Sequence, residues 1–408
     1  MSTIEVNKIT PVSGGTAIQV GESGDTITVP SGATITNSGT ANNFTSYRPN
    51  AQAIIINGDC SISQRGTANA DESTSGIYRV DSMNVGLSSI GEFRLSQETL
   101  TSGNAFANGF TKAFRIDCAV ADASPAASDI ANMTYKMEGN TVQAFKKGTA
   151  NAEKATLSFW VRCSKTGTAQ VNLIDGDNSR MVSGTYTVSS ANTWEQKIIN
   201  FPADTTGALD NDNNKSLELE WALDAGSDFT TGSVQTSWGA SSNVNRSVND
   251  FAIQDNTAND WAITAIQLEV GEYTSSTIPP FQHESYADNL QRCQRYYYKY
   301  ADESENGGND TTLGITNSYN GGSFDCIIPF PVSMRSKPSI EQNTGSNMWR
   351  VYSNNANDTF TALSSGADSN NTESINVQPS TSVSITQGNS GILQTMDSTA
   401  YLYFAAEL

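Results

Sequence analysis

The chain has 408 residues, of which 37% are hydrophobic and only 16% are charged, and its formal net charge is −19. This length accommodates two or three domains with cores of their own, while the acidic balance argues against nucleic-acid binding and against attraction to anionic membranes. With 32 glycines and abundant Ser, Thr and Asn, the composition is typical of many short strands joined by turns.

Residues 1–45 are predicted to form an N-terminal stalk. "MSTIEVNKIT" lacks the apolar core of a signal peptide, so we expect no export by the secretory route. Within residues 16–41, Ile18 with Val20 recurs as Ile27 with Val29 between Gly-rich turns. Strands this short cannot bury a core alone, but three copies of the chain would supply partners for one another. We expect a homotrimer, with a flexible Gly/Ser leader as the alternative, and a linker over residues 42–50.

Residues 46–284 are predicted to fold as a jelly-roll β-sandwich. The segment "AIIINGDCSISQRGTA" carries an Asn-Gly pair after an apolar run, which predicts a hairpin. "ATLSFWVRC" and "LELEWALD" alternate strictly between apolar and polar residues, which predicts strands with one buried and one solvated face. Other strands are expected at "QVNLID", "WEQKIINF" and "WAITAIQLEV". In the last of these the apolar parity changes between Ala265 and Ile266, which predicts a β-bulge.

Candidate catalytic groups in this segment have simpler interpretations. Glu218 and Glu220 share one strand face about 7 Å apart, a spacing that inverting glycosidases also use, but any such strand provides it. We expect both on the solvated face. His283 is the only histidine and lacks a nucleophile motif near it, so we expect it to be a packing residue.

Two Asp-rich turns are candidate calcium ligands, with ordinary Asx turns as the alternative. Their carboxylates are Asp175, Asp177, Asp210 and Asp212. We expect no other cofactor.

Several aromatic side chains in polar surroundings are candidates for binding a glycan or receptor, because an exposed ring can stack on a sugar. The alternative for each is a ring tucked under a loop. The candidates are Trp160 with its neighbour Arg162, Trp238, Trp349 and Tyr352.

Residues 285–302 are predicted to be a linking helix, and residues 303–408 a smaller β-sandwich. Ser285 with Asp288 is typical of a capping box. Apolar residues then follow at helical a/d spacing and predict a buried face for domain or trimer packing. They are Tyr286, Leu290, Cys293, Tyr297 and Tyr300. Strands are expected at "LGIT", "FDCIIPFPVSM", "MWRVY", "FTAL", "INV", "SVSIT" and "AYLYFAAEL".

The five cysteines show no metal-binding or disulfide spacing, and we expect buried free thiols. They are Cys60, Cys118, Cys163, Cys293 and Cys326. No apolar run approaches the roughly 20 residues that span a bilayer, so membrane insertion is not expected.

Three stretches resemble bacteriophage tail-fibre and related virion proteins. They are "IINGDCSISQRGTA" followed by "YRVDSM", "WAITAIQLEVGEYTSSTIPPFQHESYADNLQRCQRYYYKY", and "IPFPVSMRSKPSI". The leader over residues 16–41 resembles those of marine-phage fibres. "YRVDSM" departs from the pattern, because such proteins often carry Trp after the acidic residue.

The resemblance implies a non-enzymatic virion fibre, made in the host cytoplasm. Its N-terminus would dock on other virion proteins. Its C-terminal sandwich would bind a host-surface glycan or outer-membrane receptor. The alternatives are a head-bound fibre or decoration protein without receptor activity, and a glycan-depolymerising tailspike. A tailspike of that kind usually has a long β-helix, and no repeat of sufficient length is present.

Overall fold

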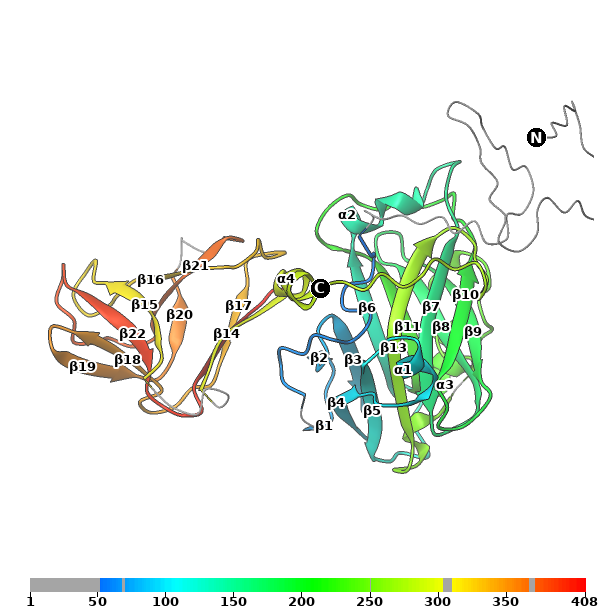
Figure 1. Cartoon of the computed structure of the whole chain (residues 1–408), viewed down its shortest axis with the longest axis horizontal. Helices are drawn as coiled ribbons and strands as arrows, with labels where there is room; N and C mark the ends of the chain where they lie inside the picture. Colours follow the sequence, from blue (N-terminus) through cyan, green and yellow to red (C-terminus); the bar gives the residue numbers. More distant parts are fainter. Residues whose placement is uncertain (1–51, 68–69, 250, 304–309, 367–370) are drawn as a thin grey trace, which may run out of the picture. The chain divides into compact units, whose positions relative to one another are not determined.

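The computed structural model describes residues 52–67, 70–249, 251–303, 310–366 and 371–408, which belong to one compact unit, Tyr47–Leu408. This part of the chain is mostly β-structure and contains two β-sandwiches with separate hydrophobic cores (Figure 1). The all-β prediction is thus confirmed. The predicted stalk over residues 1–45 lies outside the described residues.

The first sandwich packs a six-stranded sheet on a seven-stranded sheet, and neighbouring strands run antiparallel. In the order of the six-stranded sheet, its members are β1 (Ala70–Glu72), β4 (Glu92–Thr99), β5 (Lys112–Val120), β13 (Asp260–Val270), β7 (Ala155–Cys163) and β10 (Glu195–Phe201). The seven-stranded sheet has the order β12 (Gly239–Ala240), β9 (Arg180–Val188), β8 (Gly167–Asp175), β11 (Lys215–Ala225), β6 (Ile130–Glu138), β3 (Met83–Ser88) and β2 (Ile77–Tyr78).

The predicted alternation positions the core of this sandwich. Leu157, Phe159 and Val161 of β7 face Leu219 and Trp221 of β11 across the space between the sheets, and all five are fully buried. Short helical turns lie in the connections between these strands. They are α1 (Gly103–Ala107), α2 (Gly139–Val142), α3 (Ser227–Thr230), η1 (Gln143–Phe145), η2 (Asn243–Asn245) and η3 (Ile253–Asp255).

The predicted β-bulge in β13 is confirmed. Ala265 has a φ of 56°, and the pairing of β13 with β7 shifts register between Thr264 and Gln267. The bulge frees the amide of Ile266, which donates a hydrogen bond of 2.8 Å to the carbonyl of Gly58. Gly58 lies in the segment predicted to be a hairpin. That prediction is wrong, because residues 52–67 form no strand and dock on the bulge instead.

The C-terminal sandwich contains three small antiparallel sheets around a core that includes Trp349, Phe324 and Phe404. Their orders are β14 (Tyr297–Asp302), β23 (Tyr401–Ala405), β17 (Ser339–Gln342); β15 (Thr312–Asn317), β22 (Ser390–Thr395), β18 (Trp349–Ser353), β19 (Ala356–Phe360); and β16 (Cys326–Pro329), β21 (Ser374–Pro379), β20 (Leu363–Ser365). Sequence reasoning missed β17 and β22, and the strand predicted at "SVSIT" is absent.

The predicted linking helix is correct in its first half and wrong in its second. Helix α4 spans Tyr286–Gln294, and the Ser285 hydroxyl caps it by accepting a hydrogen bond from the amide of Asp288, as predicted. The chain then enters β14, which pairs with β23. The C-terminal sandwich therefore begins at Tyr297, before the acidic break predicted to precede it.

The residues of the predicted helical stripe do not share one buried face. Tyr286 is 65% exposed, Leu290 is half-buried, and Cys293 is buried. Tyr297 and Tyr300 belong to β14, where Tyr297 is buried and Tyr300 packs against the C-terminal core. The a/d spacing was misleading because two of its five positions lie in a strand.

The five cysteines are free and buried, as predicted. Burial raises the pKa of the Cys118, Cys163 and Cys326 thiols to about 11 each. These thiols are therefore poor nucleophiles at neutral pH.

Candidate functional site

An exposed apolar row crosses the four-stranded sheet of the C-terminal sandwich. Ile392 of β22 is paired on one side with Ile315 of β15 and on the other with Tyr352 of β18. Ile315 is 77% exposed and Tyr352 is 37% exposed, while Ile392 is half-buried. Cross-strand partners point to the same face of a sheet, so these three side chains line one outward surface.

Two further exposed side chains belong to the segments that follow β15. An isolated antiparallel bridge between Asn317 and Asp325 joins the end of β15 to the residue before β16, the strand that carries Ile327. Ile327 is 69% exposed, and Tyr319, which follows β15, is 76% exposed. We call Ile315, Tyr319, Ile327, Tyr352 and Ile392 the apolar face.

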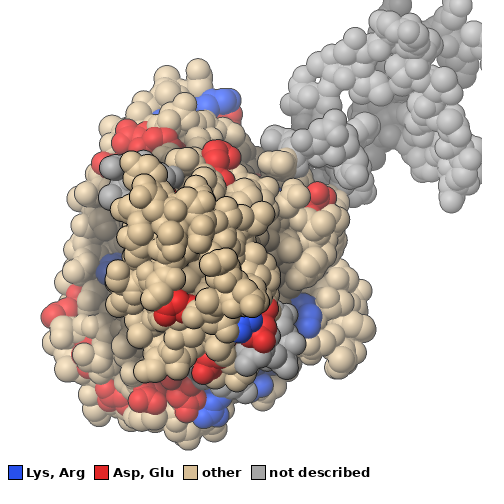
Figure 2. All heavy atoms as spheres, turned by 90° about the vertical axis from the view of Figure 1, so that its left-hand side faces the viewer, with Lys and Arg blue, Asp and Glu red and all other residues tan. Residues whose placement is uncertain are grey.

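The surroundings of the apolar face are largely uncharged. Figure 2 views the side on which β15, β18, β19 and β22 lie, and most of that surface carries neither acidic nor basic side chains. Exposed apolar patches on soluble proteins commonly mark interaction sites.

The hairpin between β18 and β19 positions Tyr352. Asn354 and Asn355 both have positive φ, 51° and 60°, which suits the two-residue turns that join twisted strands. The turn brings Asn355 Oδ1 within 2.8 Å of the Tyr352 hydroxyl, which donates to it. The aromatic ring is thereby fixed beside exposed amides, a combination that suits stacking and hydrogen bonding to a neutral ligand.

Of the aromatic candidates predicted from sequence, Tyr352 is exposed and Trp349 is not. Trp349 is fully buried in the C-terminal core, so its prediction as a binding platform is wrong. The apolar-polar alternation in "MWRVY" was the available signal, because it places Trp349 with Val351 on the inner face. Sequence reasoning missed Ile315, Ile327 and Tyr319, which no aromatic or charge pattern marks.

The other predicted candidates lie in the first sandwich and are engaged by protein groups. Trp160 is half-buried against a small cluster that includes Trp194. Arg162 forms ion pairs with Glu98 and Asp260 at 2.8 and 2.9 Å. The indole nitrogen of Trp238 donates to the carbonyl of Pro202 at 2.8 Å. All three side chains thus contact groups of the first sandwich, whereas the apolar face belongs to the C-terminal sandwich.

The predicted calcium ligands do not converge. Asp175 is fully buried and paired with the Lys147 ammonium, which occupies the position a cation would take. Asp177 accepts from the amide of Asp210, and Asp212 accepts from the amide of Asn214. In the described ranges, no group of three or more His, Cys, Asp or Glu side chains is arranged to hold a metal ion.

The expected solvated face of β11 is partly covered. The Glu218 side chain is 12% exposed and pairs with Lys215 at 2.6 Å, and Glu220 is only 1% exposed. Glu220 is bound by Asn132 and Asn172 of the neighbouring strands and by Arg246, which belongs to the segment that follows β11. The prediction that Glu220 is solvated is therefore wrong. The His283 ring lies near those of Phe110 and Phe281, with ring centroids 5.2 and 5.0 Å away, but His283 is exposed, which differs from the buried position expected of a packing residue.

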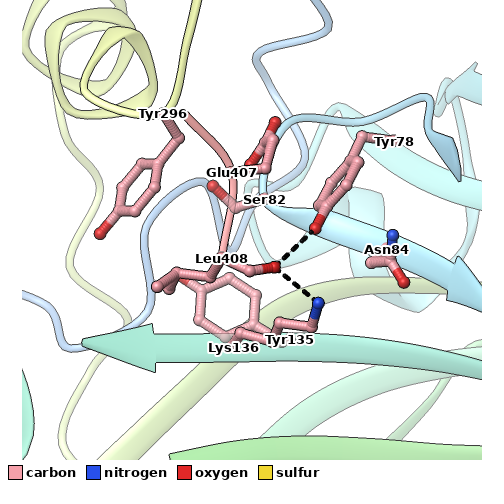
Figure 3. Close-up of a pocket in the computed structure, with 8 residues that line it drawn as sticks. All are labelled: Tyr78, Ser82, Asn84, Tyr135, Lys136, Tyr296, Glu407 and Leu408. Atoms are coloured by element: carbon pink, nitrogen blue, oxygen red, sulfur yellow. Dashed lines mark hydrogen bonds between the residues drawn. The ribbon is translucent and has the colours of Figure 1, made fainter. Parts of the chain in front are cut away.

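A cleft of about 600 Å³ lies where the two sandwiches meet. Two arginines in its lining bind other protein groups at this junction. Arg65 forms an ion pair of 2.9 Å with Glu407 and lies 3.3 Å over the ring of Tyr297. Arg335 donates to the carbonyls of Ala406 and Glu407. Figure 3 shows the adjoining pocket, where Lys136 and Tyr78 point toward the main-chain oxygen of Leu408.

Glu138 is the most strongly engaged acid at this junction. Its carboxylate accepts two bonds of 2.7 Å from Arg295 and one of 2.6 Å from the Tyr296 hydroxyl. Burial alone would raise the pKa of Glu138, but these bonds outweigh it and lower the pKa below its usual value. Burial raises the pKa of Glu407 instead.

No protein-family model and no curated protein matches the chain. Similarity was found to solved structures. One is the enzymatically active domain of bacteriophage CBA120 tailspike protein 4, with a TM-score of 0.26 and 12% identity, over 53% of this chain and 21% of that chain. Another is a CBM4 structure, with a TM-score of 0.27 and 8% identity, over 52% of this chain and 97% of that one.

A third is the family 11 carbohydrate-binding module of a Clostridium thermocellum cellulase, with a TM-score of 0.25 and 8% identity, over 51% and 99% of the two chains. Identities and TM-scores this low assign no function to the chain. Among its described helices, none is long and apolar enough to cross a membrane.

Proposed function

We propose that this chain is a non-enzymatic bacteriophage fibre protein that attaches the virion to its host, with the apolar face of the C-terminal sandwich binding an uncharged surface glycan. The observation that carries the proposal is this face itself, where Ile315 and Ile327 are more than two-thirds exposed beside Tyr319 and Tyr352. The resemblance of three sequence stretches to virion fibres supplies the context.

The charge of the chain supports a neutral ligand. Bacterial envelopes are anionic, and a chain with a net charge of −19 is repelled from them at long range. An uncharged contact surface avoids adding like-charge repulsion at short range. The face has no deep pocket among the described cavities, so single-site affinity would be modest, and three copies in one fibre would compensate through multivalency.

The engagement of the acidic side chains supports a binding role over a hydrolytic one. Inverting glycosidases need two carboxylates free to face the substrate and a water. Here Glu220 is enclosed by Arg246 and two asparagines, and Glu218 is paired with Lys215. A glycan cannot reach the Glu220 carboxylate without displacing the covering segment.

The proposal is tested by measuring adsorption of purified full-length protein to host cells. Changing Ile315 to Ser and Tyr352 to Ala together should reduce adsorption at least tenfold, because both side chains contribute exposed contact area without supporting the core. Val120, 47% exposed in the first sandwich, provides the matched control as Val120→Ser. Equal adsorption by the double variant and the control would disprove the assignment of the apolar face.

The alternative functions give different results in the same preparation. A head-bound decoration protein would be found on capsids and would not adsorb to cells. A depolymerase would release reducing sugars from host glycans, and the variant Glu218→Gln/Glu220→Gln would abolish that release.

A further inference from the structure

A buried lysine joins three segments at one end of the first sandwich. Lys147 follows η1, Asp175 ends β8, and Asp204 follows β10. Their side chains are 4%, 0% and 4% exposed. None of these residues takes part in the apolar face or in the junction between the sandwiches.

The Lys147 amine is held from several sides. It contacts the Asp175 carboxyl directly and lies 3.0 Å from Asp204 Oδ2. The carbonyls of Gly207 and Thr206 accept from it at 2.9 and 3.2 Å. The Trp238 ring centroid is 4.8 Å from Nζ. The adjoining cavity is mostly apolar, with Glu153 as a further charged group in its lining; the apolar residues are Phe145, Ala155, Leu173, Leu217 and Pro202.

We propose that Lys147 and Asp175 react to form an intramolecular amide, a covalent cross-link between the loop after η1 and the end of β8, with Asp204 moving the proton. The reactive groups are in direct contact, a second carboxylate is within hydrogen-bonding distance of the amine, and solvent is excluded. These are the conditions under which a lysine amine attacks a carboxyl group.

The first step is a proton transfer from the Lys147 ammonium to Asp175. Asp175 also accepts from the amide of Asn178 at 3.0 Å and from its side-chain nitrogen at 3.0 and 3.2 Å. In a site closed to solvent, the transfer leaves a neutral amine beside a neutral carboxylic acid and avoids the cost of two buried charges. The amine keeps two hydrogens, which Gly207 O and Asp204 Oδ2 are placed to accept. Its lone pair is then left to face Cγ of Asp175.

The second step forms the C–N bond and releases water. As Nζ attacks Cγ, one Nζ proton passes to the Asp204 carboxylate, which delivers it to the hydroxyl leaving Asp175. One water departs, one hydrogen stays on the amide nitrogen, and Asp204 returns to its ionised form. The adjoining cavity of about 20 Å³ has room for that water.

Arg180 keeps Asp204 ready for this role. Its Nε donates to Asp204 Oδ2, the oxygen that also faces Lys147, at 2.8 Å, and a terminal nitrogen donates to Oδ1 at 3.0 Å. Burial opposes ionisation, but the bonds from Arg180, Lys147 and Thr206 lower the pKa of Asp204 to about 2. Asp204 is therefore ionised at neutral pH, and in the step above it takes up the proton only briefly before passing it on.

The test is the intact mass of the purified full-length protein under denaturing conditions. After allowance for removal of Met1, the proposal expects a species lighter than the sequence mass by one water. Trypsin should fail to cleave after Lys147 and should yield residues 147–154 joined to residues 166–180.

The Asp175–Gly176 pair needs a control, because such pairs also lose water by forming a succinimide. A succinimide stays within the linear peptide 166–180 and leaves Lys147 cleavable. Lys147→Arg retains the charge and should restore the full mass, whereas a succinimide would persist. A wild-type mass equal to that of the sequence, or a water loss that survives Lys147→Arg, overturns the proposal.

Discussion

Single residues at the junction decide how firmly the two sandwiches are joined. Glu138 at the end of β6 binds Arg295 and Tyr296, which lie between α4 and β14, so one carboxylate connects both domains to the link between them. Because these groups are buried or half-buried, their loss leaves polar atoms that water does not easily reach.

We predict that Glu138→Gln lowers the free energy of unfolding at neutral pH by roughly 2 kcal/mol, less than for a fully buried pair because Arg295 is half-exposed. The folded-state pKa of Glu138 is lowered, so its stabilisation exists above the ordinary glutamate pKa. It is lost as the pH falls through the lowered value.

Urea unfolding at a series of pH values measures this effect. The wild type and Glu138→Gln should differ at neutral pH and converge in acid. Glu153→Gln, at an exposed pair with Lys146, should change little at any pH. A constant difference between wild type and Glu138→Gln across the range would contradict the ionic origin.

The sequence predicted well which side chains point into the core. It predicted less well which of the outward-pointing side chains are exposed to solvent. Leu217, Leu219 and Trp221 are buried as their alternation requires. Glu220 also points to the predicted side, but a segment distant in sequence covers it, and strand periodicity holds no information on such coverage. The apolar face was missed for the same reason, since an exposed Ile in a strand has the same local pattern as a buried one.

At the scale of elements, the bulge in β13 shows how a local irregularity anchors a distant segment. Its freed amide binds Gly58, and a Cβ on Gly58 would lie 2.2 Å from the carbonyl oxygen of Ile266. Asn57 reinforces the attachment, because its side-chain oxygen accepts from the amide of Ile62 at 2.9 Å and its own backbone amide donates to Asn289 Oδ1 of α4 at 3.1 Å. The bulge was predictable from parity, whereas its partner was not.

Gly58→Ala should therefore destabilise the protein by at least about 1 kcal/mol, because either the bulge or the docked segment must move. Gly321→Ala is the matched control, since the nearest atom to its added Cβ is 3.9 Å away. Thermal unfolding of the two variants gives the comparison, and equal melting temperatures would show that the docked segment yields without cost.

Helix and strand share the stretch 285–302 because local spacing cannot decide between them there. The capping box fixes the start of α4, and that part of the prediction held. Beyond Gln294, the tyrosine-rich run has high strand propensity, and pairing with β23 supplies the partner that a local pattern cannot reveal. The prediction failed where a contact across about a hundred residues outweighed it.

For the whole molecule, the three stretches that resemble virion fibres come together at the junction. Gln64 donates to the carbonyl of Tyr297 and to Asp81, and the amide of Arg335 donates to the carbonyl of Arg295. The second stretch thus contacts both the first and the third. The resemblance to virion fibre proteins is therefore concentrated at the junction between the sandwiches. The apolar face does not belong to these stretches, apart from their neighbour Ile327.

A chain ending at Asp302 should be less soluble than the full chain, because β14 would keep its exposed edges without β23. We expect a chain ending at Gln294 to aggregate less than the longer one. Size-exclusion chromatography of the two truncated chains tests this order, and a chain ending at Asp302 that is as soluble as the full chain would place the domain boundary where the sequence suggested.

The homotrimer remains a prediction from the periodic N-terminal segment. Light scattering on full-length protein should give three times the chain mass of 43.5 kDa. Deleting residues 1–45 should lower this value to that of one chain while leaving the melting temperature of the sandwiches unchanged. A monomer at micromolar concentration in the full-length sample would remove the multivalency argument.

The central position of β23 in its sheet determines which part of the chain recombination can exchange as one folded unit. This strand lies between β14 and β17 in its sheet, so the first strand of the C-terminal sandwich, β14, pairs with its last strand, β23. Both ends of the segment are therefore needed to complete this sheet. Recombination at the acidic break would pair a β14 from one parent with a β23 from another. A crossover between Gln294 and Tyr297 transfers the whole sandwich, and the junction residues around Glu138 and Arg65 then decide which new tips the remaining chain accepts.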